Sequence, residues 1–133
     1  MVDDPKKAHA TTILVAESEA TARVSLSELL RDEGHSVVEA ADNVSAVSEL
    51  SRDPSIQVIL VDIEMPSWTS IIQQARLNLP NSFILGMVRY GALANALQAK
   101  QLGANTHLVK PLSFAEVNQW IQRYLTGKLQ FTP

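Results

Sequence analysis

Cysteine is absent from the 133 residues of this chain, and this absence excludes several kinds of protein. Without cysteine there is no disulfide framework, no thiol nucleophile, no iron–sulfur cluster and no thiolate-bound zinc. Long apolar runs are also missing, and none approaches the ~18 residues that a membrane-spanning helix requires. Residues 1–7 carry charges that no apolar stretch follows, so they do not have the pattern of a secretory signal.

An excess of positive charge is missing as well. The chain has 11 basic and 14 acidic residues and a formal net charge of −3, which argues against a basic nucleic-acid-binding surface. Hydrophobic residues make up 46% of the chain, which is too many for a disordered protein. The length fits a single domain with one core. We therefore expect one soluble, cytoplasmic domain that contacts neither a membrane nor nucleic acid directly.

Short apolar runs alternate with segments of helical periodicity along the chain. The runs at 12–16, 36–40, 57–62, 83–88 and 107–110 are typical of strands, and the segments at 22–30, 43–50, 68–79, 93–102 and 113–125 of helices. This alternation predicts an α/β fold, a doubly wound five-stranded parallel sheet with helices on both faces. We expect the domain to cover residues 11–126, with a loose lead at 1–10 and a tail or the start of a linker at 127–133.

Polar side chains follow several of these predicted strands. Glu17 and Ser18 come directly after the first run, Asp62 ends the third and Lys110 ends the fifth. Open parallel sheets bind ligands at the carboxyl ends of their strands. We therefore expect these side chains to converge on one rim of the sheet.

Four motifs occur in the order and spacing of a known family. They are Ile13-Leu-Val-Ala-Glu-Ser-Glu19, Gly34-His-Ser-Val-Val-Glu-Ala40, Val58-Ile-Leu-Val-Asp-Ile-Glu-Met-Pro66 and Leu108-Val-Lys-Pro111. Together they resemble the receiver domain of the response regulators of bacterial two-component signalling, over about residues 12–125. The resemblance implies a flavodoxin-like fold and a signalling module that is not itself an enzyme.

The resemblance also implies a role for each rim residue. Asp62 would be the phosphoacceptor, taking a phosphoryl group from a histidine kinase or a phosphotransfer protein. Lys110 would hold the phosphoryl oxygens, and its bond to Pro111 would be cis. Mg²⁺ would be held by Glu17, by Asp62 and by the backbone carbonyl of Glu64. A downstream protein partner or a fused output domain would read the phosphorylated state, and a homodimer is compatible with the family.

The first departure from the family concerns the metal. Ser18 stands where receiver domains have a second acid, and a neutral hydroxyl is a poor replacement for a carboxylate on Mg²⁺. We expect Ser18 to act as the N-cap of the following helix, because serine is favoured at that position. Any Mg²⁺ would then be weakly bound.

Two further departures lie between the acceptor and the fifth strand. Residues 83–89 contain no hydroxyl. Counting back from the lysine puts Val88, or Met87 after a slip of one residue, where the family has Ser or Thr. Arg89, Tyr90 and Glu64 are expected to flank the phosphoryl site. The segment after the acceptor is a few residues short and has Ser67 in place of the usual glycine, so we expect a clipped third helix.

Two functions remain open at this point. The first is a phosphorelay receiver that works through Asp62 and switches a surface for partner binding. The second is a pseudo-receiver, an interaction module with little or no phosphorylation. A flavodoxin-like cofactor binder is disfavoured, because the loop after the first strand is acidic and has no glycine to cradle a phosphate.

Overall fold

In the computed structural model, which describes residues 10–127, five strands and five helices alternate along the chain. The strands are β1 (Thr12–Ala16), β2 (Ser36–Ala40), β3 (Ile56–Asp62), β4 (Phe83–Arg89) and β5 (Thr106–Lys110). The helices are α2 (Ala20–Asp32), α3 (Asn43–Arg52), α4 (Trp68–Asn78), α5 (Leu93–Leu102) and α6 (Phe114–Leu125). Most of the expected lead and tail lies outside the described residues. Within them, no helix is long and apolar enough to cross a membrane.

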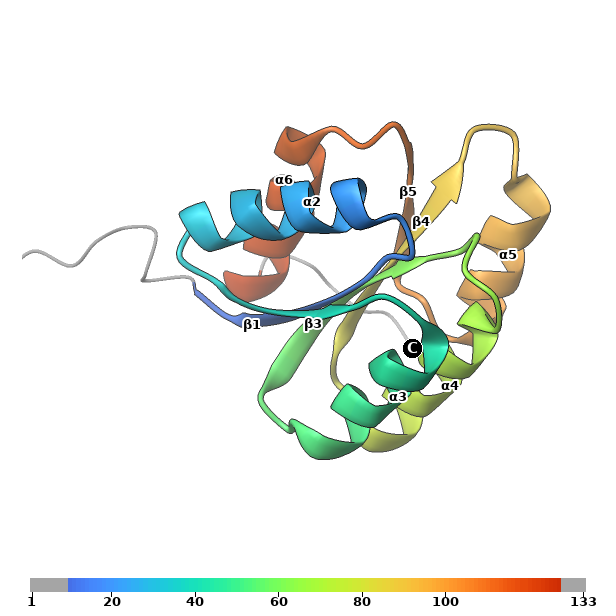
Figure 1. The fold of residues 1–133 in the computed structure, drawn as a ribbon, viewed down its shortest axis with the longest axis horizontal. Helices are drawn as coiled ribbons and strands as arrows, with labels where there is room; N and C mark the ends of the chain where they lie inside the picture. The colour runs from blue at the N-terminus through green and yellow to red at the C-terminus, as the bar shows by residue number, and fades with distance from the viewer. Residues whose placement is uncertain (1–9, 128–133) are drawn as a thin grey trace, which may run out of the picture.

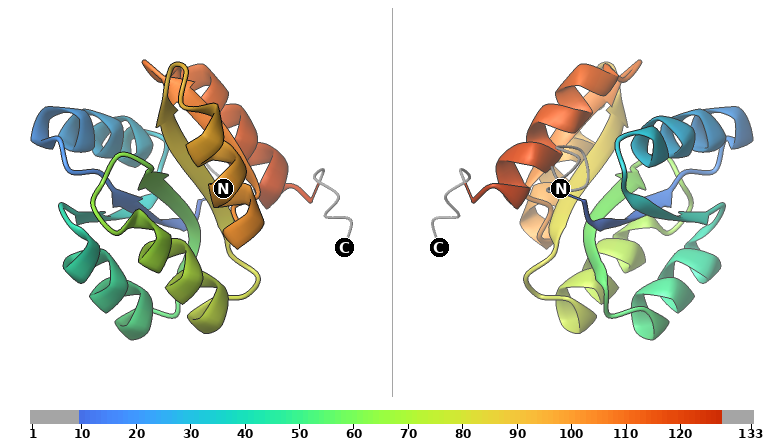
Figure 2. Two further views of the ribbon diagram at one scale, coloured as in Figure 1. Left: turned by 90° about the vertical axis from the view of Figure 1, so that its right-hand side faces the viewer. Right: turned by 90° about the vertical axis from the view of Figure 1, so that its left-hand side faces the viewer.

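All five strands are parallel and form one sheet in the order β2-β1-β3-β4-β5. Helices α2 and α6 cover one face, and α3, α4 and α5 cover the other (Figures 1 and 2). The predicted doubly wound, flavodoxin-like fold is therefore confirmed. The chain reverses its direction of winding between β1 and β3, and the crevice at their carboxyl ends is the usual ligand position in such sheets.

The central strand β3 shows how the core positions the site. Its side chains alternate between two hydrophobic clusters: Ile59 and Val61 pack towards α3, α4 and α5, whereas Val58 and Leu60 pack towards α2 and α6. Because successive side chains of a strand point to opposite faces, Asp62 follows Leu60 on the side of α2 and α6. The same burial on both faces explains why β3 is the most apolar run of the sequence.

The expectation that Ser18 caps the first helix is wrong. The N-cap is Glu19, whose carboxylate accepts hydrogen bonds from the backbone N–H groups of Thr21, at 3.2 Å, and Ala22, at 2.6 Å. A carboxylate has two oxygens and satisfies two of the free N–H groups at the helix start, where a hydroxyl would satisfy fewer. The hydroxyl of Ser18 is thereby left to turn towards β3.

Helix α4 is the third helix along the chain, and it is not clipped as we expected. It has 11 residues, compared with 10 each in α3 and α5. Its N-cap is Ser67, which has φ 59° and ψ 30° and makes no side-chain hydrogen bond. This left-handed conformation is unfavourable for a residue with a Cβ atom, which is why glycine is the usual choice there.

The side chain of Arg76 joins α4 to two loops at the amino-terminal edge of the sheet. Its Nε donates to the carbonyl of Gly103 at 2.9 Å, and its Nη2 donates to Oδ1 of Asn105 at 2.8 Å. Its Nη1 donates to the carbonyls of Ser82 at 2.8 Å and Pro80 at 3.1 Å. One guanidinium thus holds the end of α5 and the connections that lead into β4 and β5.

Substitution of Arg76 is therefore expected to destabilise the fold. Arg76→Ala should lower the free energy of unfolding by about 2–3 kcal/mol, because partly buried carbonyl groups lose their donors. Urea denaturation measures this change. Arg52→Ala is the control, since Arg52 is exposed and forms a surface ion pair with Glu49, and its effect should stay within about 0.5 kcal/mol. Equal losses in the two variants would contradict the role of Arg76.

Candidate functional site

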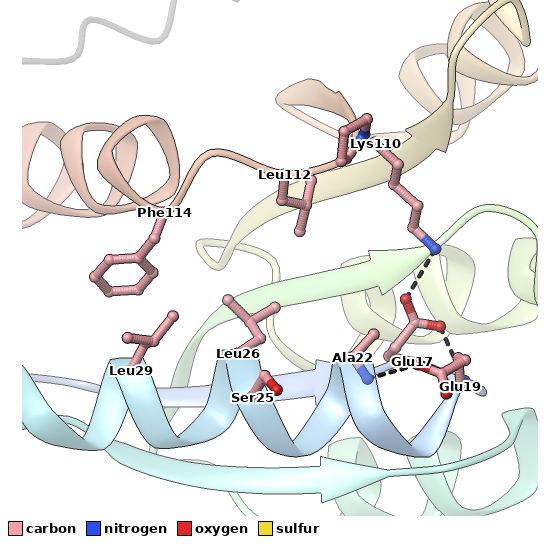
Figure 3. Close-up of a pocket in the computed structure, with 10 residues that line it drawn as sticks. Glu17, Glu19, Ala22, Ser25, Leu26, Leu29, Lys110, Leu112 and Phe114 are labelled. Atoms are coloured by element: carbon pink, nitrogen blue, oxygen red, sulfur yellow. Dashed lines mark hydrogen bonds and ion pairs between the residues drawn. The ribbon is translucent and has the colours of Figure 1, made fainter.

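Three charged side chains from distant parts of the sequence meet at the carboxyl edge of the sheet. The ammonium Nζ of Lys110 lies 2.8 Å from Oε1 of Glu17 and 3.1 Å from Oδ1 of Asp62. The two acids are only 3% and 1% exposed. Figure 3 shows Lys110 extending from the end of β5 to reach Glu17 after β1. The convergence expected from the sequence is thus confirmed.

Both carboxylate oxygens of Asp62 are engaged. Oδ1 accepts from the backbone N–H of Glu64 at 2.9 Å as well as from Lys110. Oδ2 accepts from the hydroxyl of Ser18 at 3.1 Å. The residue that we expected to cap a helix therefore contacts the acceptor carboxylate itself. These contacts fix the orientation of a carboxylate that would otherwise rotate freely.

The three groups change one another's pKa. Burial, followed by the neighbouring Asp62, raises the pKa of Glu17. Burial also acts to raise the pKa of Asp62, but the neighbouring Glu17, the backbone N–H of Glu64 and the ammonium of Lys110 outweigh it and lower the pKa. For Lys110, burial acts to lower the pKa, but the two carboxylates raise it overall. Asp62 is thus held as a carboxylate and Lys110 as a cation at neutral pH.

The remaining predicted site residues lie around this cluster in different settings. Arg89 and Glu64 form an ion pair, with 3.6 Å between Nε and Oε1, and Tyr90 is 87% exposed. Val88 is buried in the cluster under α3, α4 and α5, on the opposite face from Asp62. The Lys110–Pro111 bond is cis, as the resemblance implied.

An apolar groove that the sequence analysis did not anticipate runs up to this cluster. It has a volume of about 460 Å³ and lies between α2 and the segment that joins β5 to α6 (Figure 3). Its apolar walls come from Ala22, Leu26, Leu29, Leu112 and Phe114. No sequence pattern signals this groove, because the 43% exposure of Leu29 on its wall is seen only in the structure.

The oxygen atoms at the rim could hold a magnesium ion, but with two carboxylates and not three. Among residues 10–127 no group of three or more acids, histidines or cysteines is placed to hold a metal. The available donors are the carboxylates of Glu17 and Asp62, the hydroxyl of Ser18 and the carbonyl of Glu64. Mg²⁺ commonly uses one or two carboxylates and keeps several waters, so this donor set suits it chemically.

A doubly wound sheet with a buried aspartate and a lysine at its carboxyl edge is the architecture of a signalling receiver domain. The family model for the response regulator receiver domain matches residues 13–122. The chain belongs to this family.

Curated relatives agree with the assignment. Sporulation initiation phosphotransferase F of Bacillus subtilis is 27% identical over 118 residues, covering 87% of this chain and 94% of that protein. Transcriptional regulatory protein PdtaR of Mycobacterium tuberculosis is 33% identical over 109 residues, covering 79% of this chain and 52% of that protein. Response regulator protein FleR of Pseudomonas aeruginosa is 28% identical over 122 residues. That match covers 90% of this chain but only 26% of FleR.

Two solved structures are similar to this chain over nearly their whole length. A receiver domain protein from Clostridium thermocellum has a TM-score of 0.81 and 25% identity, covering 89% of this chain and 96% of that one. The receiver domain of the sensor histidine kinase PA1611 from Pseudomonas aeruginosa has a TM-score of 0.79 and 25% identity, covering 88% and 98%. That domain has a magnesium ion coordinated in its active-site cleft.

Removing the cation of the cluster should destabilise the fold in a pH-dependent way. Lys110→Met should lower the free energy of unfolding by about 2 kcal/mol at neutral pH, because two buried carboxylates lose their counter-charge. The raised pKa of Glu17 means that this carboxyl takes up a proton earlier than an ordinary glutamate as the pH falls. The destabilisation should therefore shrink on acidification, as measured by denaturation at several pH values.

A matched control is Lys100→Met, which removes an exposed lysine from α5. It should change the free energy of unfolding little at any pH. A loss for Lys110→Met that did not vary with pH would show that lost packing, and not unpaired charge, causes it.

Proposed function

We propose that this chain is a phosphoryl-accepting signalling module, and not an enzyme, in which Asp62 accepts a phosphoryl group from the phosphohistidine of a histidine kinase or phosphotransfer protein. The observation that carries this proposal is the contact between the buried Asp62 carboxylate and the Lys110 ammonium. A carboxylate that remains ionised is a competent nucleophile. A cation beside it is already placed where negative charge accumulates during transfer.

The proposed step forms one bond and breaks another. A carboxylate oxygen of Asp62 attacks the phosphorus, a P–O bond forms, and the P–N bond to the imidazole breaks. The imidazole keeps the electron pair of that bond and takes up a proton from solvent. Lys110 then holds phosphoryl oxygens, while the N–H of Glu64 and the hydroxyl of Ser18 keep the carboxyl group oriented.

Magnesium would be held by Glu17, Asp62 and the backbone carbonyl of Glu64. When bound, Mg²⁺ supplies positive charge that offsets the crowding of carboxylate and phosphoryl oxygens. The magnesium in the PA1611 receiver domain supports this assignment by similarity. Ser18 contributes a hydroxyl where a carboxylate would bind the ion more strongly, so we propose weak metal binding.

The proposal extends to the domain boundaries and partners. Residues 11–126 would form the receiver unit, and a downstream protein or a fused output domain would read its phosphorylated state. The relatives of which this chain covers a quarter to a half support such an arrangement by similarity. The receiver unit could also bind a second copy of this chain as a homodimer.

Phosphorylation of Asp62 is tested directly by mass. The protein is incubated with Mg²⁺ and a small acyl phosphate, and its intact mass is measured by mass spectrometry. The wild type should gain the mass of one phosphoryl group, and Asp62→Asn should gain none, because an amide is not a nucleophile for this transfer. Asp53→Asn changes a half-buried aspartate that precedes β3 at the opposite edge of the sheet, and this variant should behave like the wild type.

The alternative outcome is equally specific. If the wild type gains no phosphoryl mass and does not bind beryllium fluoride, the chain is a pseudo-receiver that acts through contacts alone. A mass gain retained in Asp62→Asn would place the acceptor elsewhere.

Restoring the missing acid should strengthen metal binding. Ser18→Asp is expected to increase Mg²⁺ affinity about tenfold or more, because it adds a hard anionic ligand beside Asp62. Isothermal titration calorimetry measures the affinity. Ser18→Ala is the matched control and should bind Mg²⁺ no more tightly than the wild type. Unchanged affinity in Ser18→Asp would contradict the placement of the metal beside Ser18.

A further inference from the structure

The cluster of Glu17, Asp62 and Lys110 contains two acids and one cation. Glu17 and Asp62 already share the single ammonium of Lys110. A phosphoryl group brings a charge of about −1.5 to −2, in place of the single charge of the Asp62 carboxylate. With Glu17 still present, Lys110 alone leaves a substantial excess of negative charge. Mg²⁺ would supply part of the missing positive charge when bound, but Ser18 leaves the ion one carboxylate ligand short. A further cation from the protein itself would therefore stabilise the phosphorylated state.

Arg89 is placed to supply that charge. It pairs in register with Lys110 across β4 and β5, while Asp62 pairs with Met87, two residues earlier in β4. Strand alternation puts Arg89 on the same sheet face as Met87, which is also the face of Asp62. The spacing and rise of strands put the Cα atoms of Arg89 and Asp62 about 8 Å apart. An arginine side chain and a phosphoryl group together span such a separation.

The present partner of Arg89 holds it only weakly. Its Nε lies 3.6 Å from Oε1 of Glu64, and the two side chains are 73% and 34% exposed. Ion pairs this exposed contribute little, because water and salt screen them. The N–H of Glu64 bonds to Oδ1 of Asp62 at 2.9 Å, so the pair is anchored directly beside the acceptor. Arg89 therefore lies at the rim in an ion pair that is weak enough to be exchanged for another.

The backbone after Arg89 leaves room for such a movement. Gly91 has a positive φ of 88°, and the N-cap of α5, Ala92, makes no side-chain hydrogen bond. The carbonyl of Arg89 accepts from the N–H of Ala92 at 3.1 Å, so the strand end and the start of α5 are joined by a turn. A shift of Arg89 would be passed on to this lightly held segment.

We propose that Arg89 is a second cationic ligand of the phosphoryl group, an inference that rests on phosphorylation of Asp62. On phosphorylation its guanidinium leaves Glu64 and donates hydrogen bonds to the phosphoryl oxygens. A guanidinium suits this task, because its planar fork of donors matches phosphate oxygens. Among the side chains of β4, only that of Arg89 carries a hydrogen-bond donor, since Val88 and the residues before it are apolar or glycine.

The test uses beryllium fluoride with Mg²⁺ as a mimic of the phosphoryl group on the full chain. Fluorine NMR of the bound species measures its affinity. Arg89→Ala should weaken binding about tenfold or more, and Arg89→Lys, which keeps the charge but not the fork, should fall between. Arg52→Ala is matched in charge and breaks a similar exposed pair, with Glu49, far from the site. It should bind like the wild type.

A double-mutant cycle separates a direct role from a structural one. Glu64→Gln frees Arg89 and leaves the backbone carbonyl intact, so it should strengthen binding of the mimic by about twofold to fivefold. In the Arg89→Ala background the same substitution should give no gain. Thermal unfolding without beryllium fluoride should be alike for the wild type and Arg89→Lys. An equal gain from Glu64→Gln in both backgrounds would overturn the exchange of partners.

The outcomes distinguish the two proposals. If the wild type gains phosphoryl mass but Arg89→Ala binds the mimic as tightly as the wild type, the role of Arg89 is wrong and the proposed function stands. If the wild type neither gains mass nor binds the mimic, both are wrong.

Discussion

The ammonium group of Lys110 lies between two buried carboxylates, and the site depends on that contact. Asp62 and Glu17 end or follow neighbouring strands, so the fold forces their negative charges together. Burial would drive both carboxyls towards their neutral forms, and a neutral aspartate could not attack phosphorus. The lysine reaches across the end of β4 from β5 and keeps Asp62 charged. Stability and reactivity at this rim thus have the same physical cause.

The sequence predicted the architecture because the spacing of its apolar residues follows the pattern of burial in strands and helices. Residues 58–61 of β3 are apolar because both faces of the strand are covered there, and the side chains of Asp42 and Ser113 cap α3 and α6. The convergence of Glu17, Asp62 and Lys110 followed from their places at the carboxyl ends of parallel strands. Motif spacing added the receiver family and the cis bond before Pro111, neither of which periodicity could supply.

Other features depended on side-chain directions in loops, and no periodicity encodes these. Ser18 and Glu19 are adjacent and both suit a helix N-cap, so only the path of the chain decides which one faces Asp62. The Arg89–Glu64 pair joins the end of β4 to the loop after β3, and the distance between them depends on the strand register. Helix α4 follows the left-handed Ser67 and is at least as long as α3 and α5, although we expected it to be clipped. In each case a local preference was overruled by tertiary geometry.

The two ends of helix α5 are held very differently. At its carboxyl end, the carbonyl of Gly103 is bonded to the Arg76 guanidinium, which also binds the loops beneath β4 and β5. At its amino end, no side chain caps the first turn, and the adjoining segment leads straight back to the acceptor rim. Between these ends, Ala96 and Ala99 pack into the hydrophobic core. Helix α5 is thus held by a charged side chain at its carboxyl end and by apolar packing alone nearer the acceptor rim.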